Sequence, residues 1–309
     1  MCRVLLYKGS PVSLADLLYE PNNSLVKQAY QPQMHNMLSL AGFGMLAWDL
    51  SSHRPELPFS YRSVNIPIFD PNLKDLADKL SVTTVIAHVR GVPYRENVTV
   101  GEQNLHPFRY KGYRLALAHN GSLAAFERMR FSLLEHIRPE IAQLIRGNTD
   151  TEWIYALFLS QIEDPHTALG PEEIVAAVER TLSIIRAVRR QHGIDTSSPT
   201  NLFISDGVNV VAVRFAFDYG CYNLHDPAGL DSNDHMFLGL WYTTGRSYGL
   251  HDGEWKMIGA PDAAGGSLLI SSEPLTRDVS TWFEVPEYSA LLSTGTGGQQ
   301  LPRVRYLAV

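Results

Sequence analysis

Cysteine is scarce in this sequence, with two residues in a chain of 309, whereas a disulfide scaffold of this size normally carries more. Long apolar runs are missing as well, since segments such as 208–213 fall far short of the ~20 apolar residues that cross a bilayer. Positive charge is not in excess either, because the formal net charge is -6. The chain offers no basic field for nucleic acid or anionic membranes, and we expect neither as a partner.

Cofactor and targeting signals are also lacking. No G-x-G-x-x-G follows a predicted strand and no G-x-x-x-x-G-K-[ST] occurs, so we expect no nucleotide cofactor, and the sequence indicates no other. The amino terminus has a short apolar stretch followed by Lys8, which is too short for the hydrophobic region of a secretory signal. A cytoplasmic location is therefore the expectation.

No internal repeat and no linker rich in Gly, Ser or Pro divides the chain, so residues 1–309 are predicted to form a single domain. A short helix should follow Ser13, and longer helices should open at Thr149 and at Pro171. Apolar runs predict buried strands at 1–7, 43–49, 83–89, 113–118, 202–204, 208–217, 238–243 and 268–271. Strands, then helices, then strands favour an α+β fold with two mainly antiparallel sheets packed face to face between helices.

Cys2 is the candidate nucleophile. The thiolate is the reactive form of cysteine, and at neutral pH it needs a base or a positive charge close by. If Met1 is removed, the α-amino group of Cys2, with an ordinary pKa of ~7.7 to 8.0, can take the proton from its own side chain. Arg3 adds a neighbouring cation. Cys221, in Tyr-Gly-Cys-Tyr, is predicted to be a small hydrophobic residue beside a strand.

Four polar motifs follow Cys2, each directly after a predicted strand or before a predicted helix, where sites are commonly built. They are Ala-His-Val-Arg-Gly (87–91), Asn-Leu-His-Pro-Phe (104–108), Ala-His-Asn-Gly-Ser (118–122) and Gly-Asn-Thr-Asp-Thr-Glu (147–152). Taken singly, Arg90 reads as a surface ion-pair residue, 119–121 as a turn and Asp150 as a helix-start charge. Together, behind a cysteine at position 2, the motifs favour a catalytic site.

In these motifs, their order and their spacing, the sequence resembles the class II glutamine amidotransferases, which are N-terminal-nucleophile hydrolases. It is most similar to short stand-alone members opening Met-Cys-Arg, such as the amidotransferase-like subunit of the fungal glutathione-degradation complex and the ergothioneine-pathway γ-glutamyl hydrolase. Segments 21–28 (Pro-Asn-Asn-Ser-Leu-Val-Lys-Gln), 271–275 (Ser-Ser-Glu-Pro-Leu) and 282–286 also look like theirs, so the resemblance spans roughly residues 1–290. It implies a four-layer αββα sandwich.

The resemblance also implies roles for individual residues in cleaving a γ-glutamyl amide through a thioester on Cys2. Arg90 would bind the α-carboxylate of the glutamyl group with its planar guanidinium, and Asp150 would hold the α-ammonium. The side-chain amide of Asn120 and the backbone N–H of Gly121 would donate to the oxyanion of the tetrahedral intermediate.

His106, in Leu-His-Pro-Phe, is a candidate substrate-binding residue whose role is less defined, because it can equally orient a loop. A rival hypothesis gathers His88, His106 and His119 into a catalytic zinc site, since three imidazoles can hold that metal. Their spacing matches no metal signature, and these histidines belong to the amidotransferase motifs. We therefore predict no metal.

One segment departs from the family pattern. The short relatives carry Asn-x-Asp-Gly-Phe-Gly before the second strand, whereas residues 39–44 read Ser-Leu-Ala-Gly-Phe-Gly, so Ser39 and Ala41 replace the Asn and the Asp. This keeps open a second hypothesis, a catalytically weak binding or scaffold subunit of a heteromeric complex. A partner subunit or a homo-oligomer fits either hypothesis, and the sequence does not name the γ-glutamyl substrate.

Overall fold

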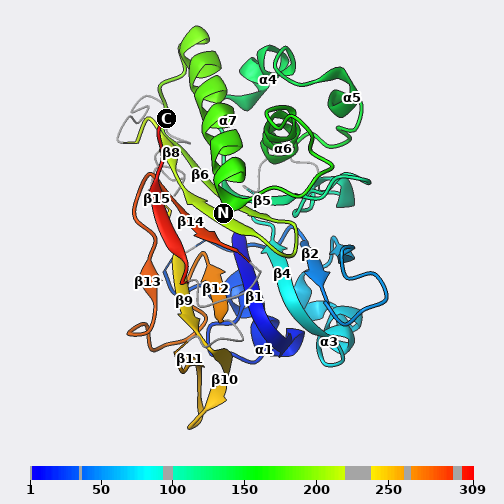
Figure 1. The fold of residues 1–309 in the computed structure, drawn as a ribbon, viewed down its shortest axis with the longest axis vertical. Coiled ribbons are helices and arrows are strands. Elements are labelled where there is room, and N and C mark those ends of the chain that lie inside the picture. The colour runs from blue at the N-terminus through cyan, green and yellow to red at the C-terminus, as the bar shows by residue number, and fades with distance from the viewer. Residues whose placement is uncertain (1, 35–36, 93–99, 220–237, 261–265, 295–300) are drawn as a thin grey trace.

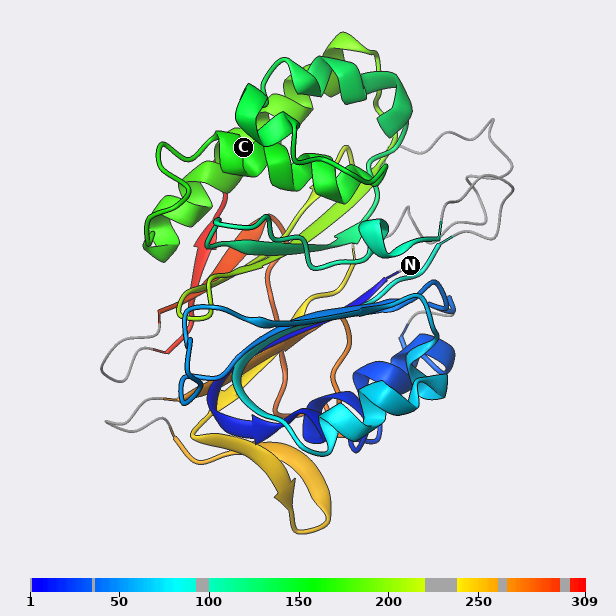
Figure 2. The same ribbon diagram turned by 90° about the vertical axis from the view of Figure 1, so that its right-hand side faces the viewer.

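The computed structural model describes residues 2–34, 37–92, 100–219, 238–260, 266–294 and 301–309, and its elements form four stacked layers (Figure 1). Figure 2 shows their order, with one group of helices, two sheets lying face to face, and a second group of helices on the far side. The predicted α+β sandwich of two antiparallel sheets between helices is confirmed. Cys221, predicted to lie beside a strand, is outside the described residues.

The first sheet has seven strands in the order β13-β9-β12-β1-β4-β2-β3, and every neighbouring pair is antiparallel. Strands β1, β2 and β4 are buried over most of their length, which is why the sequence reads there as nearly continuous apolar runs. The seven strands are β1 (Arg3–Ser13), β2 (Phe43–Trp48), β3 (Phe59–Ser63), β4 (Ser81–Val89), β9 (Trp241–Gly245), β12 (Ser267–Ser271) and β13 (Phe283–Glu284).

The second sheet has six strands, in the order β15-β14-β7-β6-β5 with β8 beside β6. A turn at Asp206 joins β6 to β7, and the Asp206 Oδ1 accepts from the N–H of Val208 at 2.9 Å. Strand β5 begins at Ala116 rather than at Tyr113, because the Tyr113 N–H closes a turn onto the carbonyl of Tyr110. The strands are β5 (Ala116–Gly121), β6 (Ser198–Ser205), β7 (Val210–Arg214), β8 (Ala216–Phe217), β14 (Ser289–Ser293) and β15 (Arg303–Tyr306).

Helices cover the outer faces of both sheets. Those beside the first sheet are α1 (Leu14–Leu18), α2 (Leu25–Tyr30) and α3 (Pro71–Ala77), and those beside the second are α4 (Phe126–Leu134), α5 (Pro139–Ala142), α6 (Asp150–Ser160) and α7 (Pro171–Gln191). The predicted helix starts are confirmed: Ser13 caps α1, Thr149 caps α6, and Pro171 is the first residue of α7. Two 3₁₀ turns, η1 (Pro67–Phe69) and η2 (Glu102–Asn104), and the hairpin β10 (Ser247–His251)–β11 (Glu254–Ile258) complete the described elements.

The two faces of strand β1 enter different cores. Side chains alternate along a strand, so Val4 and Leu6 point into the space between the sheets, where they pack with Ala116 and Ala118 of β5. Leu5 and Tyr7 point to the opposite face, toward the layer of α1 to α3. Residues 2 and 3, at the start of this strand, therefore begin on different sides of the sheet.

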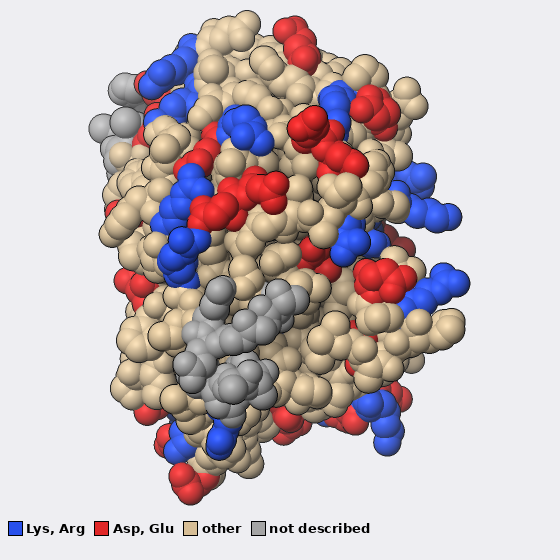
Figure 3. Space-filling view, viewed as in Figure 1, with Lys and Arg blue, Asp and Glu red and all other residues tan. Residues whose placement is uncertain are grey.

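The surface carries both signs of charge. On the face drawn in Figure 3, basic and acidic side chains are interspersed and no continuous basic field is present. Among the described residues, no helix is both long enough and apolar enough to span a membrane.

Candidate functional site

Cys2 lies directly before β1, the central strand of the first sheet, and its side chain is buried. The sulfur is 3.6 Å from the carbonyl oxygen of Gly91, which follows β4. Burial raises the pKa of the Cys2 thiol, while the positive charges of the chain's amino terminus and of Arg90 act against that shift. The negative charge of Asp150 adds to it. The thiol is therefore held beside one cationic and one anionic side chain from distant parts of the sequence.

Arg90 reaches this position because it follows the last residue of β4, which pairs antiparallel with β1. Its backbone is fixed on both sides, since the Arg90 N–H donates to Gly42 (2.9 Å) and the Arg90 carbonyl accepts from Ala41 (2.8 Å). The segment that departs from the family pattern thus holds Arg90 through the backbone groups of Ala41 and Gly42, while the Ser39 N–H donates to the Ala29 carbonyl. The Arg90 side chain is 7% exposed and interacts electrostatically with both Cys2 and Asp150.

Asp150 is the first residue of α6 and accepts backbone hydrogen bonds on both carboxylate oxygens. Its Oδ2 accepts from the Leu123 N–H at 2.8 Å, and its Oδ1 accepts from the Thr151 N–H at 2.7 Å. Leu123 comes soon after β5, so this carboxylate joins the start of α6 to the end of the strand that carries Asn120. Asp150 can be both a helix-start charge and a site residue, because the hydrogen bonds that it makes at the start of α6 also fix its position beside Arg90.

Asn120 and Gly121 end strand β5. The Asn120 Nδ2 donates to the Ser272 Oγ at 3.1 Å, and that oxygen also accepts from the Val4 N–H at 3.0 Å, so Asn120 is tied to the strand that follows Cys2. Gly121 lies against the backbone of Pro199 so closely that a Cβ at position 121 would overlap the Pro199 carbonyl. Glycine is required here by this close approach.

His106 is buried, and its ring lies 4.1 Å from that of His88, measured between centroids. Burial lowers the pKa of both histidines well below its ordinary value, and the nearby charge of Arg90 lowers it further. His119 acts electrostatically on both rings, and its own Nδ1 is 3.0 Å from the Thr151 Oγ1 on α6. In the part of the chain that the structure describes, no group of three His, Cys, Asp or Glu side chains is arranged to hold a metal ion.

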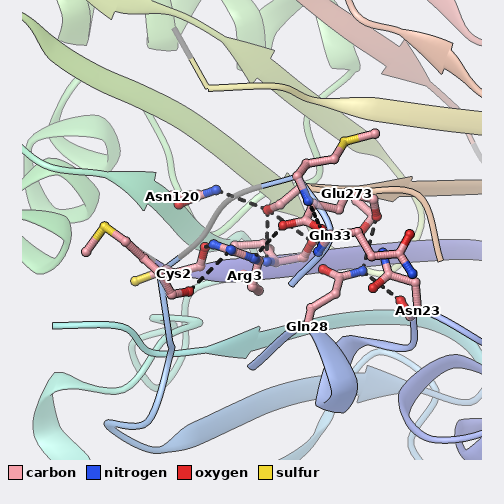
Figure 4. Close-up of polar contacts among 12 residues, drawn as sticks. Cys2, Arg3, Asn23, Gln28, Gln33, Asn120 and Glu273 are labelled. Carbon is pink, nitrogen blue, oxygen red and sulfur yellow. Dashed lines mark hydrogen bonds and ion pairs between the residues drawn. The ribbon is translucent and has the colours of Figure 1, made fainter. Parts of the chain in front are cut away.

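Arg3 is a cation near Cys2, as the sequence suggested, and the two groups interact electrostatically, but the close contacts of its guanidinium are with other groups. Its Nη1 donates to the Cys2 carbonyl at 3.1 Å, and its Nε lies 3.0 Å from the Glu273 Oε1, with both side chains fully buried (Figure 4). Strand alternation places Arg3 on the helix side of the sheet, away from the thiol. Its charge is therefore balanced by Glu273, and the Arg3 side chain holds the backbone of Cys2.

Glu273 lies in segment 271–275, which the sequence analysis connected with the family but with no role in the site. The structure brings this segment together with segment 21–28 (Figure 4). The Glu273 Oε2 accepts from the backbone N–H groups of Gln33 (3.0 Å) and Met34 (3.1 Å). Gln28 on α2 donates to the Glu273 carbonyl at 3.2 Å, and Asn23 donates to the Pro274 carbonyl at 2.7 Å. A fully buried arginine in a strand requires a carboxylate, and that requirement was the available signal for Glu273.

Comparisons with known proteins agree with this geometry. Residues 73–217 match the family model described as glutamine amidotransferases class-II. "Probable glutamine amidotransferase DUG3" of Saccharomyces cerevisiae is 29% identical over 309 residues, covering 94% of this chain and 81% of the yeast protein. The chain is thus similar to class II glutamine amidotransferases over its middle part and to the yeast protein over most of its length.

Solved structures show the same fold. The glutamine aminotransferase class-II domain protein of Silicibacter pomeroyi superposes with a TM-score of 0.60 and 21% identity, and all of both chains is covered. The glutamine phosphoribosylpyrophosphate amidotransferase of B. subtilis gives a TM-score of 0.56 and 17% identity over 99% of this chain and 49% of that one. This chain thus has the fold of these solved structures.

Proposed function

We propose that this protein hydrolyses a γ-glutamyl amide bond through a thioester on Cys2. The observation that carries the proposal is the placement of a buried thiol at the end of a central strand, under the opposing charges of Arg90 and Asp150. A free γ-glutamyl end carries one carboxylate and one ammonium, so a site with one cation and one anion beside the nucleophile matches it in charge.

The proposed reaction begins with removal of Met1, which leaves the α-amine of Cys2 beside its own sulfur. The amine takes the thiol proton, and the thiolate attacks the amide carbon to form a tetrahedral intermediate. The C–N bond then breaks as the departing nitrogen takes the proton from the ammonium. Water attacks the resulting thioester, which releases the γ-carboxylate as glutamate and returns the thiol.

The oxyanion would be stabilised by the Asn120 amide and the Gly121 N–H. An amide group has two hydrogens, so Asn120 can keep its bond to Ser272 and still donate to the intermediate. Removal of one such donor typically lowers the rate about 10²- to 10³-fold. We assign His106 to the wall of the substrate site, since its neutral ring adjoins Arg90.

A second function is retained, a catalytically weak binding or scaffold subunit within a heteromeric complex. The observation that favours it is the replacement of the family's Asn and Asp by Ser39 and Ala41 in the segment that holds Arg90. Release of glutamate in a burst by the purified protein would exclude it. A single domain over 1–309, a cytoplasmic location and association with a partner subunit or a second copy remain predictions.

The first test concerns Cys2 and Met1. Cys2→Ala should fold normally and lose γ-glutamyl hydrolysis by a factor on the order of 10⁴ or more, because the nucleophile is gone. Cys221→Ala is the matched control and should keep its rate. Mass spectrometry should find the active protein lighter by one methionine and labelled at Cys2 by a glutamine-like electrophile. Full activity in a preparation that retains Met1 on every molecule would refute the mechanism.

The second test concerns the carboxylate clamp. Arg90→Lys keeps the charge but loses the planar fork, and we expect kcat/KM to fall roughly ten- to hundredfold. Substrates without the α-carboxylate should lose the same factor with the wild-type protein and show no further loss with the variant. Wild-type turnover by Arg90→Lys would show that this side chain does not bind the carboxylate.

A further inference from the structure

A second cavity lies beside the candidate active site and plays no part in the proposed reaction. It has a volume of about 330 Å³, which is within the range of small-molecule sites. Phe108 forms part of its lining, and the other face of this segment meets the site, since the Phe108 ring packs on His106 with centroids 5.2 Å apart. Glu152, on the first turn of α6 with Asp150, forms another part.

The lining of this cavity is unbalanced in charge. It contains four cationic side chains and a single carboxylate, that of Glu152; the cations are Arg62, Arg109, Lys111 and Arg146. Of the ion pairs within the described ranges, none includes any of these four cations. Arg62 and Arg109 are half-buried, whereas Lys111 and Arg146 are exposed. Cationic groups that are withdrawn from water normally have an anionic partner, so the excess of positive charge around Arg62 and Arg109 requires an explanation.

The charges of Glu152 and Glu102 act on Arg62 from a distance, but the Glu152 carboxylate forms its hydrogen bonds with other groups. Its oxygens accept from the backbone N–H groups of Arg146 (3.1 Å) and Gly147 (2.6 Å) and from the Tyr110 hydroxyl (3.5 Å). These bonds hold the 146–147 loop to the first turn of α6. The carboxylate thus shapes the cavity wall and leaves the guanidinium groups to face the cavity.

Two of the arginines are partly withdrawn from water. The Nε atoms of Arg62 and Arg109 are buried and have no hydrogen-bond partner among the described residues. Arg62 is held in place because its Nη2 donates to the Pro107 carbonyl at 2.7 Å. Burial also lowers the pKa of both guanidinium groups, which reflects the cost of desolvating charge. A bound anion would offset that cost.

We propose that this cavity is a binding site for a small anion with at least two negative charges, carried by carboxylate or phosphate groups. Arg62 and Arg109 present guanidinium forks, which bind either group with two parallel hydrogen bonds, and Lys111 and Arg146 add charge from more exposed positions. The volume suits a compact molecule. The site is separate from the reaction at Cys2, so its test needs no turnover.

The test is isothermal titration calorimetry of the full chain with inorganic phosphate and, separately, with citrate. Saturable binding of one anion per chain is expected, and the tighter of the two probes identifies the anionic group. Arg109→Gln combined with Arg146→Gln should weaken binding at least about tenfold, because each removes a charge-assisted hydrogen-bond donor. Arg54→Gln combined with Arg277→Gln removes two exposed arginines outside the cavity and should leave the affinity unchanged.

The variant Glu152→Gln should change the affinity for the anion in the opposite direction to the arginine variants. Removal of the one negative charge in the lining should tighten anion binding. If the cavity instead bound a cation, the same variant would bind its ligand more weakly. Thermal unfolding should establish that each variant is folded, and if Glu152→Gln is not, the paired arginine variants decide alone. Absence of binding by both probes, or equal affinity in the Arg109→Gln/Arg146→Gln protein and the wild type, would overturn the proposal.

Discussion

The two faces of the central sheet beneath Cys2 bury polar groups in opposite ways. On the helix side, Arg3 is fully buried and charged, and Glu273 lies 3.0 Å from it. On the side between the sheets, His88 is equally buried, and neither ring nitrogen has a hydrogen-bond partner in the described part of the chain. The helix side thus buries a charged group together with its counter-ion, whereas the side between the sheets buries a histidine in its neutral form.

The chemistry of the two side chains explains this difference. Guanidinium cannot lose its proton in a protein, so a buried arginine must have an anion close by. Imidazole can lose its proton, and burial lowers the pKa of His88 until the neutral ring is the stable form. The charges that act on Cys2 are those of the amino terminus, Arg90 and Asp150.

The largest effect is expected when the balance on the helix side is broken. Glu273→Gln leaves Arg3 buried without an anion, and removal of one partner from a buried ion pair costs about 3–5 kcal/mol. Chemical denaturation of the two proteins measures the change in the free energy of unfolding. The matched control is Asp218→Asn, whose partner Arg189 is buried while Asp218 itself is 39% exposed. Asp218→Asn should lower the free energy of unfolding by only about 1 kcal/mol.

A compensating variant separates stability from positioning on the same face. Arg3→Met combined with Glu273→Leu removes both charges, and such apolar replacements of buried pairs are often neutral for stability. The Cys2 carbonyl would nevertheless lose the donor on Arg3. We expect the double variant to have nearly the wild-type free energy of unfolding but a slower rate of Cys2 alkylation. If the alkylation rate also equals that of the wild type, the pair does not position Cys2.

Between the sheets, the expected effect depends on pH. The unfolded chain protonates each histidine below its ordinary pKa of 6.5, while burial keeps His88, His106 and His119 neutral in the folded state. The unfolded state therefore binds more protons, and stability falls as the pH drops below about 6.5, by about 1.4 kcal/mol per pH unit for each histidine.

Denaturant unfolding at a series of pH values between neutrality and mild acid measures this slope. His88→Leu removes one proton-binding group from a place where its nitrogens make no hydrogen bond, so the slope should decrease by one proton. An unchanged slope would mean that His88 takes up its proton in the folded state as readily as in the unfolded one, and the contrast between the two faces would then fail.

The comparison also shows which features the sequence could predict. The helix starts at Thr149 and Pro171 and the buried strands followed from capping residues and apolar runs, because those signals are local. The grouping of Arg90, Asp150 and Asn120 near Cys2 was expected from the family resemblance, since the four motifs are far apart in the chain. The charges of Arg90 and Asp150 act on Cys2, and Asn120 bonds Ser272 beside the strand that follows Cys2; the roles of these residues stay predictions.

Pairings across long distances were not predictable in the same way. Arg3 required a carboxylate, but nothing local distinguishes Glu273 from the other acidic residues of the chain. Glu273 becomes the partner because β12 pairs with β1 and ends beside its start. The cationic lining of the second cavity was likewise hidden, since Arg62 and Arg146 meet only through the packing of β3 and the loop before α6.

The smallest change in the free energy of unfolding is expected for a solvent-exposed ion pair. Such a pair separates the influence of burial from that of pairing. Arg305 lies 2.7 Å from Glu172 on the surface, with side chains 33% and 48% exposed, and Arg303 contacts the same carboxylate. Water screens these charges, so Glu172→Gln should cost no more than about 1 kcal/mol. Salt near 1 M shortens the screening length to about 3 Å and should remove most of that difference. Unfolding of both proteins at low and high salt measures it. A loss as large as that of Glu273→Gln, or one that salt does not reduce, would show that pairing itself rather than burial sets the cost of a missing partner in this fold.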